Sequence, residues 1–125
     1  MHEYSVMRQL LTALEDELEK QGIDRVKEVE LHIGELTFLG KEQLEFAYEV
    51  MTKDSFLEGS TLNVVIVNGE VRCDHCGYQG GIEYVDDPAF HYNIPIITCP
   101  KCGEKPKLIK GKETTIVGVR AFKED

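Results

Sequence analysis

The sequence has no tryptophan, only five phenylalanines and few basic residues. These shortages limit the size of the apolar core and the kinds of partner that the chain can bind. So few large aromatic side chains indicate a modest apolar core. The 14 lysines and arginines against 23 aspartates and glutamates leave a formal net charge of −9. A chain this acidic repels the phosphate backbone, so we expect no nucleic-acid partner, whereas basic partners and metal cations are favoured.

Long apolar runs are absent as well. The longest uninterrupted run, Val64–Val67, is four residues, far shorter than a membrane span. The N-terminal residues show neither the basic n-region nor the apolar h-region of a secretory signal. We therefore expect no membrane association and a reducing cytoplasm, in which paired cysteines more often hold a metal than form disulfides.

Two segments carry apolar residues at helical spacing. Residues 4–21 place six of them on one broad stripe before Gly22, a natural helix stop: Val6, Met7, Leu10, Leu11, Leu14 and Leu18. Residues 41–53 return to the same period through Leu44, Ala47, Tyr48 and Met51. The sequence therefore predicts two amphipathic helices.

Three segments have the pattern of strands. Residues 26–34 alternate between apolar and polar, which predicts a half-buried strand with His32 on its polar side. Residues 61–67 and 114–122 are rich in β-branched side chains, which favour strands. The order predicts an α+β fold, with two helices on a small, mainly antiparallel three-stranded sheet.

An insert interrupts this sheet. Residues 70–110 contain all four cysteines, all four prolines and little periodicity. We expect them to form a separate zinc-ribbon-like module between the last two strands. At 125 residues the chain has room for one domain and a small insert. The predicted division is therefore one α+β domain from residues 1–69 plus 111–125, and a second domain from residues 70–110.

The four cysteines form two Cys-x-x-Cys-Gly motifs, and 22 residues separate the pairs. Each motif places two sulfurs on a tight turn, and the glycine that follows permits the backbone angles which the turn needs. Two such turns brought face to face make a tetrahedron of thiolates suited to zinc. A closed four-sulfur site has no open position for catalysis, so it is expected to be structural. The predicted metal ligands are Cys73, Cys76, Cys99 and Cys102.

Other interpretations of these turns stay open. Iron is an alternative metal, because the motifs also resemble those of rubredoxin, and free redox cysteines or two disulfides are further options. His75, inside the first motif, is either an exposed polar residue or a replacement ligand that exchanges with a thiolate as pH changes.

The chain opens Met-His-Glu, which places an imidazole one peptide bond from the terminal amine. The amine of Met1, the backbone nitrogen of His2 and its nearer imidazole nitrogen can bind one ion together, closing a five-membered and a six-membered ring. This arrangement suits ions that prefer square-planar nitrogen ligands, nickel(II) or copper(II). One corner of the plane stays vacant, and a site completed from elsewhere suits a metal that is handed on.

Several groups are candidates for that corner: Glu3, His91 or a side chain of a partner. Glu3 has an alternative role, because an acidic residue in the first turn stabilises the helix dipole. The alternative for His91 is a loop histidine that packs against Tyr92. These alternatives stay open at the level of the residues.

We expect no enzyme, because every cysteine lies in a metal-binding motif and no Gly-x-x-x-x-Gly-Lys-[Ser/Thr] loop is present to hold GTP. Two binding functions compete with metal transfer. A zinc ribbon that binds nucleic acid or protein is suggested by lysines beside the second motif: Lys101, Lys105, Lys107, Lys110 and Lys112. A rubredoxin-like iron protein is less favoured, since it would not need the long N-terminal α+β part.

Taken together, the opening Met-His-Glu and the paired cysteine motifs resemble the HypA/HybF family of hydrogenase nickel-insertion accessory proteins. The resemblance runs nearly end to end and includes Gly34–Leu36, Leu44–Glu49 and Glu58–Val64. The spacer between the cysteine motifs is longer than in bacterial members. A spacer of this length is long enough to fold back toward the N-terminus, which favours His91 as the completing nickel ligand.

The resemblance implies a nickel metallochaperone for [NiFe] hydrogenase maturation. It implies that residues 1–69 plus 111–125 bind transferable nickel through His2, with Met1 and Glu3 contributing, and that residues 70–110 bind structural zinc through the cysteines. The implied partners are the nickel-binding GTPase HypB and the large subunit of the [NiFe] hydrogenase.

Overall fold

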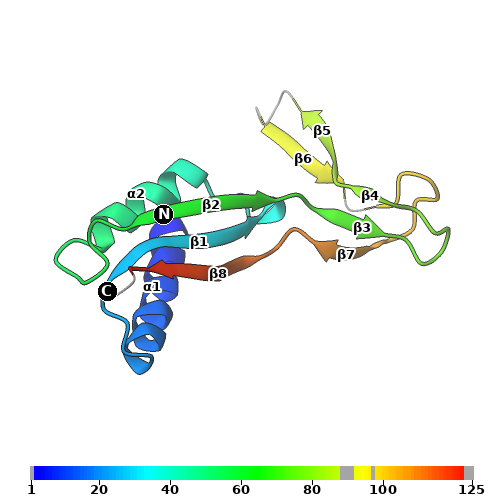
Figure 1. Ribbon diagram of the computed structural model, residues 1–125. Coiled ribbons are helices and arrows are strands. Elements are labelled where there is room, and N and C mark those ends of the chain that lie inside the picture. The colour runs from blue at the N-terminus through cyan, green and yellow to red at the C-terminus, as the bar shows by residue number, and fades with distance from the viewer. Residues whose placement is uncertain (1, 88–91, 97, 123–125) are drawn as a thin grey trace.

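The computed structural model describes residues 2–87, 92–96 and 98–122, without the side chains of residues 2, 85–87 and 92–96. The molecule is elongated, with helices α1 and α2 and a three-stranded sheet at one end and the cysteine-bearing loops at the other (Figure 1). No helix in the described part of the chain combines the length and apolarity needed to cross a membrane.

Helix α1 spans His2–Lys20, so the predicted helix is confirmed and begins two residues earlier than the predicted segment 4–21. Met7, Leu11, Leu14 and Leu18 are buried, at the spacing that puts them on one face. The helix ends where Gly22 adopts a left-handed φ of 72°. This conformation lets the backbone N–H groups of Gly22 and Ile23 reach carbonyls in the last turn, which closes the helix.

Strand β1, Val26–Gly34, is the centre of the first sheet, whose order is β2-β1-β8. Val29, Leu31 and Ile33 are fully buried, whereas His32 on the opposite face is only partly buried. The predicted alternation is therefore confirmed. Both helices pack on the apolar face of the sheet, and the other face stays open (Figure 1).

The sheet is mixed. After β1 the chain passes through a short 3₁₀ helix, η1 (Glu35–Thr37), and then α2 (Lys41–Met51) before it enters β2 (Thr61–Val67). Because α2 carries the chain back along the sheet, β2 lies parallel to β1, with Leu31 opposite Val64. Strand β8 (Thr114–Ala121) pairs with β1 in the expected antiparallel sense. The antiparallel character that we predicted therefore holds for β1–β8, whereas β1–β2 is parallel.

The insert forms between β2 and β8, as the composition change predicted. Strands β3 (Glu70–Arg72), β4 (Gln79–Gly81) and β7 (Lys107–Lys110) make an antiparallel sheet in the order β4-β3-β7. Strands β5 (Glu83–Asp87) and β6 (Tyr92–Ile96) pair as a separate antiparallel hairpin. The first sheet leads into the second through β2–β3 and returns through β7–β8 (Figure 1).

Three glycines pack at the junction between the two sheets. A Cβ atom on Gly34 would lie 2.1 Å from the carbonyl carbon of Gly111, and one on Gly111 would lie 2.7 Å from Cα of Gly69. Gly111 also has a φ of 126°, which other residues rarely adopt. Beside them, Glu35 Oε1 accepts a 2.6 Å hydrogen bond from the N–H of Gly69. The Tyr84 hydroxyl donates to Glu35 Oε2. The junction is therefore tightly packed and tied to the β5–β6 hairpin.

Candidate metal centres

The two Cys-x-x-Cys-Gly motifs form matching turns, one after β3 and one before β7. In the first, the N–H of Gly77 donates to the carbonyl of Cys73 at 2.8 Å, and in the second the N–H of Gly103 donates to Cys99 at 2.9 Å. Gly77 and Gly103 have φ values of 81° and 80°, the left-handed region that the motif predicted. The two turns have the same geometry and face each other, so that the four sulfurs lie close together.

The sulfur atoms of the four cysteines all lie within 4.8 Å of one another. The sulfurs of Cys73 and Cys102 are 3.6 Å apart, as are those of Cys76 and Cys99. A tetrahedral ion with metal–sulfur bonds of about 2.3 Å separates its ligands by about 3.8 Å. The donor set therefore fits one such ion, with Cys73 and Cys99 buried and Cys76 and Cys102 exposed.

The thiols have divergent acidities when no cation is bound. Burial raises the pKa of Cys99. The N–H groups of Cys102 and Lys101 and the neighbouring thiols lower it by more, so the net pKa is about 7. For Cys102 the N–H of Glu104 lowers the pKa, yet burial and the other three cysteines outweigh it and raise the value to about 12. Four converging thiolates repel one another, so a divalent cation is the natural charge partner of this cluster.

The side chains around the sulfurs contribute no further ligand among the described residues. His75 lies exposed on the first turn and is outside the sulfur cluster. Two of the nearby lysines contact local groups. Lys107 Nζ pairs with Asp74 Oδ2 at 2.9 Å, and Lys101 Nζ lies 5.9 Å from the centre of the Tyr78 ring.

Of the candidate nickel ligands, His2 and Glu3 lie in the described residues, at the start of α1. His2 is the first residue of α1, and the side chain of Glu3 in the same turn reaches α2. Glu3 Oε2 accepts a 3.1 Å hydrogen bond from the N–H of Gly40, the residue that precedes α2. Met1 and His91 lie outside the described residues. The structure thus ties the start of α1 to the start of α2.

His32, the other histidine of this half, lies on the open face of the sheet. Its Nε2 is 3.0 Å from Glu30 Oε2 on the same strand. Glu30 is in turn 3.4 Å from Asn63 Nδ2 on β2. We assign His32 to this surface network, in keeping with the strand-surface role that the alternation predicted.

Sequence reasoning missed Glu35 and Tyr84, whose side chains join η1 to the β5–β6 hairpin. Burial first, and then the Glu35 carboxylate, raise the pKa of Tyr84 to about 12. A signal was present for Glu35, which lies in the Gly34–Leu36 segment shared with the family. No pattern in the sequence pointed to Tyr84.

Comparison with known families gives the chain its context. Residues 1–121 match the family model described as "HypA: Hydrogenase/urease nickel incorporation, metallochaperone, hypA". The hydrogenase maturation factor HypA of Methanothermobacter thermautotrophicus is 35% identical over 126 residues, covering 100% of both chains. The same factor from Methanocaldococcus jannaschii is 35% identical over 131 residues, again with 100% of both chains covered.

Two solved structures share the fold. The solution structure of the Ni metallochaperone HypA from Helicobacter pylori superposes with a TM-score of 0.65 at 22% identity and covers 98% of each chain. A second solution structure, of a HypA protein, gives 0.68 at 23% identity and covers 99% of this chain and 98% of the other. The sequence match, the two-helix fold and the four-cysteine cluster agree, and the chain belongs to the HypA family of nickel-incorporation metallochaperones and hydrogenase maturation factors.

Proposed function

We propose that this chain carries nickel(II) at its amino terminus and helps to insert it into a [NiFe] hydrogenase, while a permanent zinc ion holds the cysteine module. Its role is to bind and transfer an ion and not to catalyse a reaction. Membership of a nickel-incorporation family over residues 1–121 supports the cargo. The description of that family includes urease as well as hydrogenase, and we propose hydrogenase because the curated relatives carry that name.

One observation carries the proposal: the start of α1, which carries His2 and Glu3, lies in the helical part of the molecule, away from the loops that bear the four cysteines (Figure 1). The four sulfurs close on one another and leave no open corner for a transferable ion. The nitrogen ligands at the start of α1 are therefore the donors left for nickel, which prefers square-planar nitrogen coordination.

In this proposal the terminal amine of Met1 and the backbone and imidazole nitrogens of His2 supply three donors. His91 or Glu3 completes the plane. Because Glu3 also bonds to the N–H of Gly40, it holds the start of α1 against α2 whichever ligand is fourth. The start of α1, to which the proposed ligands are attached, is thereby held against the start of α2.

We further propose that the two ends act as separate domains. Residues 1–69 plus 111–125 form the nickel-binding domain, and residues 70–110 form the zinc-binding domain. The separate sheets and the glycine junction support this boundary. We propose HypB as the GTPase partner and the hydrogenase large subunit as the recipient. The reducing cytoplasm is the proposed location, because all four cysteines are free thiols in the structure.

Competitive metal titration of untagged protein tests the nickel role. The variant His2→Ala is expected to lose tight nickel binding and to keep one zinc ion and its fold. His32→Ala is the matched control, since it removes a histidine from the open sheet face of the same domain and should bind nickel normally. Equal nickel affinity in His2→Ala and wild type would refute the proposal. An absorption spectrum separates zinc, which is colourless, from iron, which would make the protein red.

A further inference from the structure

The outer face of α2 carries two exposed apolar side chains. Phe46 is 57% exposed and Val50 is 40% exposed, one turn apart on the same side of the helix. The core-facing residues Leu44, Ala47 and Tyr48 already anchor α2, so neither exposed side chain is needed for packing. Exposed apolar side chains grouped in this way are typical of contact surfaces.

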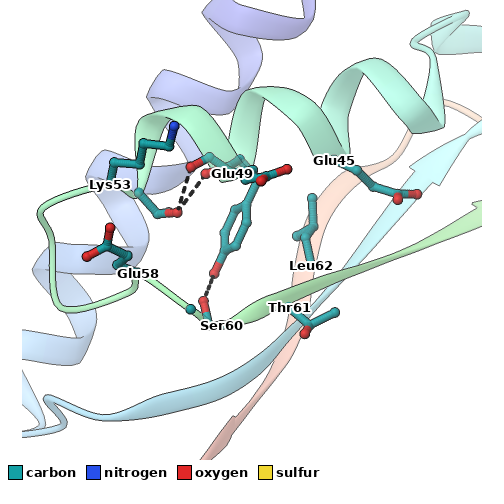
Figure 2. Close-up of a pocket in the computed structure, with 10 residues that line it drawn as sticks. Glu45, Glu49, Lys53, Glu58, Ser60, Thr61 and Leu62 are labelled. Atoms are coloured by element: carbon teal, nitrogen blue, oxygen red, sulfur yellow. Dashed lines mark hydrogen bonds between the residues drawn. The ribbon is translucent and has the colours of Figure 1, made fainter.

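Hollows flank this face on both sides. A shallow one of about 260 Å³ lies between α2 and the start of α1 and is lined by Tyr4, Glu42, Gln43 and Phe46. A second of about 420 Å³ lies between α2 and the start of β2. Figure 2 shows Glu45 and Glu49 on the helix and Glu58 on the following loop around this second hollow. A partner can therefore seat side chains on either side of the helix.

Phe38, three residues before α2, is held in an unfavourable backbone conformation. Its φ is 56°, and its side chain is 62% exposed. Non-glycine residues rarely adopt the left-handed region, and those that do cluster at functional sites. Phe38 ends η1 in this conformation, with its N–H donating to the carbonyl of Glu35, and it presents a second exposed aromatic side chain in the segment that leads into α2.

The charge around these apolar side chains is mainly negative. Glu42, Glu45 and Glu49 lie along the exposed part of α2, and Glu58 follows in the next loop, whereas Lys53 is the one cation lining the second hollow. An apolar surface edged with carboxylates is complementary to an apolar surface edged with lysine and arginine.

We propose that the α2 face, defined by Phe38, Glu42, Phe46, Glu49 and Val50, docks the apoprotein that receives nickel, through an apolar surface of that apoprotein edged with basic side chains. This rests on the proposed function, since it names the partner surface for the same transfer. Tyr4 links the face to the start of α1, two residues from His2. A recipient bound here would lie beside the nickel-carrying terminus.

The test uses the full, zinc-loaded chain and the purified precursor of the [NiFe] hydrogenase large subunit from the same organism, with binding measured by calorimetry. Phe46→Ala is expected to weaken binding roughly tenfold, and Val50→Ala roughly threefold to tenfold. Val117→Ala is the matched control: Val117 is 49% exposed on β8, at a distance from α2 in the sheet, and should bind as wild type does. Zinc content and nickel affinity are measured for each variant and should not change.

Charge is tested separately. Replacing Glu42 and Glu49 by glutamine should weaken binding at low salt and lose that effect at high salt, because surface charges are screened. Glu104→Gln, an exposed carboxylate of the cysteine module, is the control.

Three outcomes would overturn the docking proposal: variants of the α2 face that bind like wild type, a precursor that does not bind the wild-type chain, or a loss confined to binding of the GTPase. The proposed function fails on a different measurement, the nickel titration of His2→Ala. Failure of one proposal is therefore distinguishable from failure of the other.

Discussion

The two ends of this molecule are held together by different means. The α+β end has a continuous core of 14 buried side chains, drawn from α1, β1, α2, β2 and the loop between the last two. Among the described side chains of the cysteine module, residues 70–110, only Val71, Cys73 and Cys99 are buried and apolar. We therefore expect the first end to fold by itself and the second to need an ion that joins its two turns.

The largest effect should come from removing the metal site. Cys99→Ser, or a strong chelator, is expected to unfold residues 70–110 and to abolish metal binding there, because binding a structural metal is also folding free energy. The amide signals of α1, α2 and β1 should keep their positions in nuclear magnetic resonance spectra. Collapse of both ends together would show that they are not independent.

The next prediction concerns the α+β end, where a substitution opens a cavity in the apolar core. Leu31 is fully buried on the central strand, so Leu31→Ala should lower the free energy of unfolding of the α+β end by about 2–5 kcal/mol. Urea denaturation measures this loss, with Val117→Ala on the exposed part of β8 as the control. The zinc content of the folded variant should equal that of wild type. A loss of zinc would contradict the expectation that the two ends are stabilised independently.

A smaller effect should come from the junction. Tyr84→Phe removes the hydroxyl that donates to Glu35 and should cost about 1 kcal/mol. The pKa of Tyr84 is raised to about 12 from its ordinary value, so its neutral form is favoured in the folded chain. Its stabilisation is therefore fully present below about pH 10 and is lost as the pH rises toward 12.

Denaturation of wild type and Tyr84→Phe across this alkaline range measures that contribution. The gap in stability between the two should be widest below about pH 10 and narrow above it. A constant gap at every pH would mean that the hydroxyl is not held in its neutral form by Glu35.

Local patterns predicted the elements that depend on neighbours in sequence. The alternation of residues 26–34 and the β-branched run of residues 61–67 give the bounds of β1 and β2 as the structure has them. The cysteine cluster was equally predictable, because each pair of sulfurs is fixed by a turn of four residues. The turns themselves are local, whereas the contacts that close the cluster, Cys73–Cys102 and Cys76–Cys99, span 29 and 23 positions. They were predictable because two such turns share one ion.

Long-range contacts were not predictable in this way. Alternation says which face of a strand is buried but not which strand lies beside it. The helix predicted between residues 26–34 and 61–67 was compatible with parallel strands, but it did not by itself show that β1 and β2 are neighbours. The bond between Glu35 and Tyr84 spans 49 positions and depends on three glycines meeting at the junction. The exposure of Phe46 and Val50 depends on what packs around α2, which the helical period alone does not contain.

The most direct test of the account is X-ray absorption spectroscopy at the nickel edge on untagged, zinc-loaded protein. The account predicts a nickel ion surrounded by nitrogen and oxygen ligands, with imidazole scattering that disappears in His2→Ala. A first shell made of sulfur would place nickel in the cysteine cluster and would contradict the division of the two metals between the two ends.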